Sequence, residues 1–282
     1  MTVTPATTIR PPHQPWPVDA QQQQLTDSYL EPARQEIAAW LLSLRQAVDV
    51  ALEPKLPSFK GKPYPLGRCR EIRDAVAQNL NLQTPQALIQ FQHQGGFIGK
   101  IWGDLRGEYF QNALQFGAWY VDAANDTVNP DKPKLEILPL ADSRFIPIRD
   151  FHHFCRVAAK YWQVNITANT VFPRLAPFFP LICTGQDGKS RLAPAFDEMI
   201  ELTRASGFDL SADILHSLPL PDDGISAALT RHYDGIDHPL LARDGTSVEY
   251  CQQYRDGAQH LDQTFRDTAV LVYLRQIQSE QP

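Results

Sequence analysis

Tyr64-Pro-Leu-Gly-Arg-Cys-Arg-Glu-Ile72 is the stretch of sequence on which the interpretation of this chain depends. Its proline and glycine residues predict a turn that delivers Cys69 to the start of a helix over residues 68–80. The unpaired N–H groups in the first turn of a helix favour a thiolate and lower the pKa of a cysteine placed there. Arg68 and Arg70 flank the sulfur and act in the same direction. Cys69 is therefore a candidate nucleophile.

A second informative run, Tyr109-Phe-Gln-Asn-Ala-Leu-Gln-Phe-Gly-Ala-Trp-Tyr-Val-Asp122, follows further along the chain. Its apolar and aromatic residues on both sides of Gly117 predict a tight hairpin of two strands. The first strand carries the polar residue Asn112, and the second strand ends in the carboxylate of Asp122. A cysteine at a helix start followed by such a hairpin is the layout of several cysteine acyl-transfer enzymes.

Over roughly residues 60–127, these two segments resemble the transglutaminase-like branch of the papain-like cysteine superfamily. Proteins of that family carry a cysteine at a helix start, a histidine on one strand and an aspartate after the next. The resemblance implies cysteine-dependent acyl transfer or hydrolysis of an amide, thioester or fatty-acyl substrate, with Cys69 as nucleophile and Asp122 as the orienting carboxylate. Asn112 stands where the family has its histidine, so the usual base is missing from that position.

Three explanations of the missing histidine are open. His93, near the end of a predicted strand, could project into the same site and act as the base, with Asn112 polarising the acyl oxygen. A histidine from the second half of the chain, His152 or His153, could take that role instead. Alternatively the site is degenerate, and the protein is a non-catalytic binding or effector protein on a cysteine-enzyme fold.

Cys69 and Asp122 also have purely structural interpretations. Free cysteine is among the residue types most often buried, so Cys69 could be a small apolar residue under the turn. Asp122 begins a run rich in Asn and Asp over residues 122–127, whose side chains often bond their own backbone in turns.

The remaining cysteines, Cys155, Cys183 and Cys251, are too far apart in sequence for a CxxC motif, and all four thiols are expected to be reduced. Cys155 and Cys251 fall on apolar helical stripes and are expected in the core. Cys183 ends an apolar run, Phe178-Phe-Pro-Leu-Ile-Cys183, and is an alternative acyl-attachment site.

His232-Tyr-Asp234 has the histidine-x-carboxylate spacing of an iron(II) site, with His238 or His260 as a third ligand. This spacing supports an Fe(II)-dependent oxygenase only as a third option. The segment resembles a helix end and a turn, whereas that chemistry usually occupies strands. The expected site therefore has no metal, and the expected protein has no cofactor.

The composition of the chain limits the classes of partner that we expect for it. The net charge of −6 over 282 residues does not suit a general nucleic-acid binder, which is usually basic. No run of 18 apolar residues is present, so no transmembrane segment is expected. The start lacks the pattern of a secretory signal, which favours a cytoplasmic protein, although signal-independent secretion leaves no such mark. The expected partner is a small-molecule or acyl substrate, free or protein-linked, or another protein.

The chain is expected to have the α+β fold class, with a small antiparallel sheet and packed helices. Residues 1–24 are rich in Pro and Gln and predict a flexible arm, residues 25–145 an α+β half with Cys69, and residues 146–282 a mainly helical half packed into one globular unit with the first. The expected strands cover residues 88–91, 97–102, 109–116, 118–121 and 135–138. The other expected helices cover residues 26–53, 150–162, 195–205, 211–217, 224–234 and 247–278.

Overall fold

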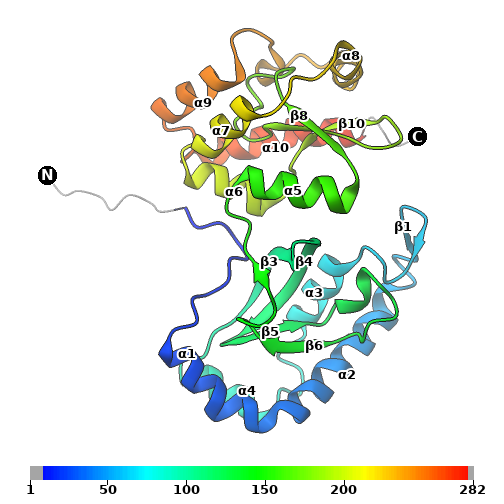
Figure 1. The fold of residues 1–282 in the computed structure, drawn as a ribbon, viewed down its shortest axis with the longest axis vertical. Coiled ribbons are helices and arrows are strands. Elements are labelled where there is room, and N and C mark those ends of the chain that lie inside the picture. The colour runs from blue at the N-terminus through cyan, green and yellow to red at the C-terminus, as the bar shows by residue number, and fades with distance from the viewer. Residues whose placement is uncertain (1–8, 279–282) are drawn as a thin grey trace, which may run out of the picture. The chain divides into compact units, whose positions relative to one another are not determined.

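The computed structural model describes residues 9–278 and confirms the α+β class (Figure 1). The chain divides into two compact units. The first contains residues 13–147, and the second contains residues 148–278 together with residues 9–12. The division falls two residues after the boundary expected from the sequence. The packing of the two units against each other stays a prediction.

The first unit is built on a five-stranded antiparallel sheet in the order β6-β5-β4-β3-β7. Its strands are β3 (Ile98–Leu105), β4 (Tyr109–Phe116), β5 (Trp119–Asp122), β6 (Glu136–Pro139) and β7 (Phe145–Ile146). The helical segments are α1 (Ala20–Leu25), the π-helical η1 (Thr26–Leu30), the 3-10 turns η2 (Glu31–Ala33) and η3 (Asn125–Thr127), α2 (Arg34–Leu52), α3 (Cys69–Gln78) and α4 (Gln86–His93). A separate two-stranded hairpin, β1 (Ser58–Phe59) and β2 (Lys62–Pro63), precedes α3.

The two faces of this sheet differ, because successive strand residues point to opposite sides. Leu114 pairs with Val121, and Phe116 pairs with Trp119, so these four side chains share one face. They belong to an apolar core that includes residues of α2, α3 and α4, such as Leu41. The residues between them in sequence, with Asp122, belong to the opposite face.

Two predictions in this unit need correction. The apolar run over residues 88–91 lies in the helix α4 rather than in a strand, and short apolar runs are compatible with either. The predicted flexible arm is ordered against the unit from His13 onward. The Trp16 N–H donates to Gln115 Oε1 (2.8 Å) and Gln115 Nε2 donates to the Trp16 carbonyl (2.9 Å), while the Trp16 ring stacks on Phe97. Residues 1–8, the first part of the predicted arm, lie outside the described residues.

The second unit combines helices with a three-stranded antiparallel sheet in the order β10-β9-β8. Its strands are β8 (Asn165–Ala168), β9 (Leu181–Thr184) and β10 (Ser190–Ala193), none of which was predicted. Its helices are α5 (Phe151–Trp162), α6 (Asp197–Ala205), α7 (Asp209–Ser217), α8 (Asp223–Arg231), the 3-10 turn η4 (Pro239–Leu241), α9 (Ser247–Asp256) and α10 (Gln263–Gln278). Asp150 caps α5 as predicted, because its side chain accepts the His153 N–H at 2.6 Å.

The predicted single helix over residues 247–278 is wrong, because α9 and α10 are separate. Ala258, two residues after the end of α9, has φ +58°, which is incompatible with a continuing right-handed helix. Among the described residues, no helix combines the length and the hydropathy needed to cross a membrane.

Candidate functional site

Cys69 is the first residue of α3, and backbone contacts fix the turn before it. The Gly67 N–H donates to the carbonyl of Thr127 (2.9 Å), which ties the turn to the segment after β5. Gly67 has φ +76°, and a Cβ at this position would lie 2.6 Å from the ring of Phe59. Only glycine meets both conditions without strain, so this glycine is required for the position of Cys69.

A buried ion network anchors the same loop to α2. The Tyr64 hydroxyl donates to Asp49 (2.6 Å), which also pairs with Arg45 (2.8 Å) and Lys134 (2.5 Å). The fully buried Arg45 reaches further and pairs with Asp126 (2.8 Å). Burial alone would raise the pKa of Asp49, but its hydrogen bonds hold that pKa below its ordinary value. Two cations and two carboxylates therefore join α2, the loop before Cys69 and the segment after β5.

The sulfur of Cys69 contacts the amide predicted to stand in place of a histidine. Asn112 Nδ2 on β4 donates to Cys69 Sγ at 3.3 Å. Burial raises the pKa of the half-buried Cys69 thiol, the Asn112 hydrogen bond opposes this increase, and the charge of Asp122 adds to it. The low thiol pKa expected from the helix start is thus wrong, because burial is the largest influence on this thiol and raises its pKa.

Asp122 lies on the other face of the sheet from Asn112. Asn112 and Leu114 share one face of β4, whereas Asp122 follows Val121 and therefore points to the opposite side. The fully buried carboxylate accepts from Gln111 Nε2 (2.6 Å), the Tyr120 hydroxyl (3.0 Å) and the Ala124 N–H (2.8 Å). Its described hydrogen bonds thus involve other residues than Asn112 and Cys69.

The desolvation of Asp122 is the largest influence on its charge. Burial raises its pKa to about 6, although the hydrogen bonds from Gln111, the Ala124 N–H and Tyr120 act in the opposite direction. The oxygen of the Gln111 amide has no hydrogen-bond partner among the described residues. This buried cluster was invisible to the sequence analysis, since it depends on the register between β4 and β5.

His93 is exposed at the C-terminal end of α4. The chain continues from there into the start of β3, where Ile98 pairs with Phe116. On β4, Asn112 lies four residues before Phe116, which corresponds to about 13 Å of strand. Among the described residues, no hydrogen bond or ion pair connects His93 with Cys69, so the structure does not bring the predicted base to the thiol.

The other predicted histidines belong to the second unit. His152 Nε2 lies 2.9 Å from Asp213, and His153 is buried in α5. A histidine that reaches Cys69 from this unit stays a prediction.

The remaining thiols lie in the second unit. Cys183, the alternative acyl-attachment site, is 2% exposed on β9, so the structure places it within the packed interior. Burial raises the pKa of Cys155, Cys183 and Cys251 to about 12 each.

The predicted iron ligands do not form a ligand set. In the part of the chain that the structure describes, no group of three or more His, Cys, Asp or Glu side chains could hold a metal ion. His232 caps the end of α8, and Nδ1 of His238 accepts the Leu240 N–H at 3.1 Å. His238 therefore acts as a local helix cap.

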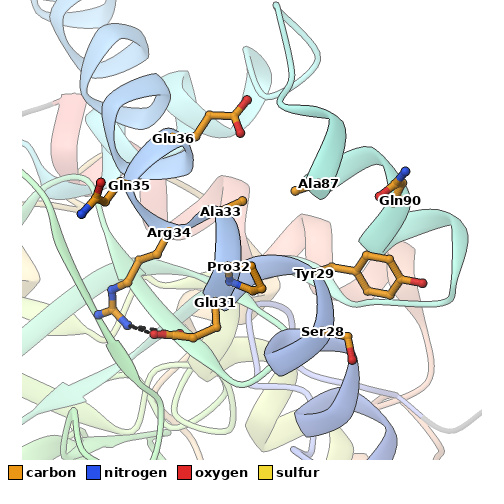
Figure 2. A pocket seen from close by; sticks show the side chains of 10 residues that line it. All are labelled: Ser28, Tyr29, Glu31, Pro32, Ala33, Arg34, Gln35, Glu36, Ala87 and Gln90. Carbon is orange, nitrogen blue, oxygen red and sulfur yellow. Dashed lines mark hydrogen bonds and ion pairs between the residues drawn. The ribbon is translucent and has the colours of Figure 1, made fainter.

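A groove that the sequence analysis missed lies between η1, η2, the start of α2 and α4 (Figure 2). It encloses about 850 Å³ and is lined by Ser28, Tyr29, Glu31, Pro32, Ala33, Arg34, Gln35, Glu36, Ala87 and Gln90. Glu31 pairs with Arg34 (3.2 Å) and accepts from the indole of Trp119 (3.1 Å), which fixes one wall. Its lining residues come from two separated segments, so no local motif marks it. It is not lined by Cys69 or Asn112.

Comparisons with known protein families, with curated proteins and with solved structures found no match to this chain. In chemical terms, the Cys69 site supplies a thiol with a raised pKa and an amide N–H donor. The described residues place no imidazole or carboxylate in hydrogen-bond contact with that thiol.

Proposed function

We propose that this chain is a non-catalytic binding protein whose first unit keeps the layout of a cysteine enzyme without its base. One observation carries the proposal: the group that contacts Cys69 Sγ is the amide of Asn112, at 3.3 Å. A carboxamide has no basic nitrogen, so it cannot accept the thiol proton during nucleophilic attack.

The surroundings of the pair support the same conclusion. A thiol with a raised pKa is mostly protonated at neutral pH and is a poor nucleophile. Asp122 is hydrogen-bonded on the opposite face, and His93 is exposed at the far end of β4. The contacts that position Cys69 nevertheless include the Gly67 hydrogen bond and the ion network. Such a scaffold suits recognition of a partner better than turnover of a substrate.

Cysteine-dependent acyl transfer is the second candidate, and it is favoured by one feature. The Asn112 N–H points to the sulfur and would stabilise a thiolate once that thiolate formed. This contribution acts against the effect of burial, which is the larger of the two.

Alkylation of the folded protein with iodoacetamide, followed by intact-mass measurement and peptide mapping, separates the two candidates. In the wild-type protein we expect Cys69 to react more slowly at neutral pH than a free cysteine. In Asn112→His, which brings an imidazole to the sulfur, we expect the rate at Cys69 to rise about tenfold or more.

Asn112→Gln is the matched control, because it keeps an amide and should leave the rate close to that of the wild type. Fast alkylation of wild-type Cys69 near neutral pH would overturn the proposal and establish thiol chemistry. A Cys69→Ser variant identifies any signal that comes from the other three cysteines.

A further inference from the structure

The segment that leads into Cys69 is the most basic part of an acidic chain. Between Glu53 and Glu71 there is no acidic residue, whereas the whole chain has a net charge of −6. We call residues 55–70 the basic segment; its cations are Lys55, Lys60, Lys62, Arg68 and Arg70. Its middle part forms the β1–β2 hairpin.

This hairpin is presented to solvent. It projects from the first unit (Figure 1), and residues 57–63 are all exposed. Lys55 and Lys62 are exposed and form no ion pair with any residue that the structure describes. Their ammonium groups are therefore available to an anionic partner.

Phe59 adds an apolar group to the same surface. Its side chain is exposed to 39%. The Arg68 guanidinium lies 5.0 Å from the ring centroid, and the Lys60 ammonium lies 5.7 Å from it. Arg68 also donates to the Ser58 carbonyl at 2.6 Å, so the hairpin is fixed to the residue that precedes Cys69.

We propose that the basic segment binds an anionic lipid surface, with Phe59 inserted among the headgroups and Lys55 and Lys62 at the phosphate level. Stable attachment to a membrane generally takes two contributions, and here a basic patch and an exposed apolar side chain each supply one. Each lysine held near an anionic surface is worth roughly fivefold in affinity.

The shape of the hairpin allows this contact despite the acidic remainder of the chain. Repulsion between exposed charges and an anionic surface is largely screened beyond about 8 Å at physiological salt. Because the hairpin projects from the first unit (Figure 1), acidic groups that lie further than this from the surface oppose the contact only weakly.

The arrangement around Phe59 favours lipid over nucleic acid. Single-stranded nucleic acids use the open face of an aromatic ring for base stacking. Here two cations already lie over the ring, and Gly67 packs against its edge. A partly exposed ring that is surrounded by cations is better suited to insertion between headgroups. This inference rests on the proposed function, since it names the partner of a binding protein.

Sedimentation with lipid vesicles tests the proposal on the full chain. We expect the wild type to bind vesicles of phosphatidylcholine with about 30% phosphatidylserine and not vesicles of phosphatidylcholine alone. Lys55→Glu with Lys62→Glu should lower the partition coefficient about tenfold or more. Phe59→Ala should lower it several-fold, with circular dichroism to verify that the variants are folded.

Lys189→Glu with Arg191→Glu is the matched control, since it makes the same charge change at exposed positions of the second unit. This variant should bind within about twofold of the wild type. An equal loss in the control, absent binding of the wild type, or equally strong binding of a single-stranded oligonucleotide would each overturn the proposal.

Alkylation of Cys69 in the same preparation separates this proposal from the proposed function. Reactive Cys69 with vesicle binding as expected would refute only the non-catalytic assignment. Unreactive Cys69 with no vesicle binding would refute only the lipid partner.

Discussion

The buried carboxyl of Asp122 makes the stability of the first unit depend on pH in an unusual direction. Burial raises its pKa from 3.8 to about 6 in the folded protein. A raised carboxyl pKa means that the folded state binds the proton more tightly than the unfolded state. Stability is therefore highest when Asp122 is protonated and falls as the pH rises through the interval between the two pKa values.

The magnitude follows from this shift. A difference of about two pKa units corresponds to about 3 kcal/mol in the free energy of unfolding, of which about 2 kcal/mol is lost between about pH 4 and 6.5. The side chain is fully buried, so solvent does not screen this contribution. Asp122→Asn removes the titration and with it this loss.

The assay is urea unfolding of the wild type and Asp122→Asn from about pH 4 to pH 8, followed by tryptophan fluorescence. Four of the five tryptophans lie in the first unit, so the signal reports mainly on that unit. As the pH rises over this range, we expect the free energy of unfolding of Asp122→Asn minus that of the wild type to increase by about 2 kcal/mol. This change does not depend on what the substitution costs at low pH.

Asp142→Asn is the control, because it removes a carboxylate from an exposed position of the same unit and so measures the effect of the charge change without burial. A pH-independent difference between wild type and Asp122→Asn would refute the reasoning. It would mean that the three hydrogen bonds to the carboxylate compensate its burial completely.

Two further predictions concern the scaffold. Arg45→Met leaves the carboxylates of Asp49 and Asp126 without their buried cation and should lower the free energy of unfolding in urea by about 3–5 kcal/mol. Adding Asp126→Asn should restore part of this loss. A loss below about 1 kcal/mol would contradict the stabilising role of the network. In the second unit, Asp150→Ala removes the acceptor of the His153 N–H and should cost about 1 kcal/mol by the same measurement with circular dichroism, whereas Asp150→Asn should cost only a fraction of that. Equal losses of stability in Asp150→Ala and Asp150→Asn would show that the helix cap does not cause the effect.

Local patterns in the sequence were sufficient for the elements around Cys69. A turn of Pro and Gly ahead of an amphipathic stretch predicts a helix start, and α3 begins at Cys69. Alternating and aromatic runs predict the strands β3, β4 and β5, and the Asp150 cap predicts the start of α5. These features depend on neighbours within a few residues. The α+β class follows from them, because successive strands joined by short turns indicate an antiparallel sheet, whereas an α/β protein alternates strands with helices.

Short segments without a clear period could not be assigned in this way. The apolar run in α4 fits a helix or a strand equally well. Because it forms a helix, His93 lies near the Phe116 end of β4 and not near Asn112. The four-residue strands β8, β9 and β10 lack a long alternating pattern and depend on pairing with each other.

The sequence by itself determined that a cysteine stands at a helix start and that an asparagine, not a histidine, lies on the following strand. Only the tertiary structure decided that Cys69 and Asn112 touch while Asp122 faces away. The register of β4 and β5 controls this outcome, since a shift of one residue exchanges the two faces of a strand. The charge states of Cys69 and Asp122 were likewise decided by the fold, because both depend on burial by segments distant in sequence.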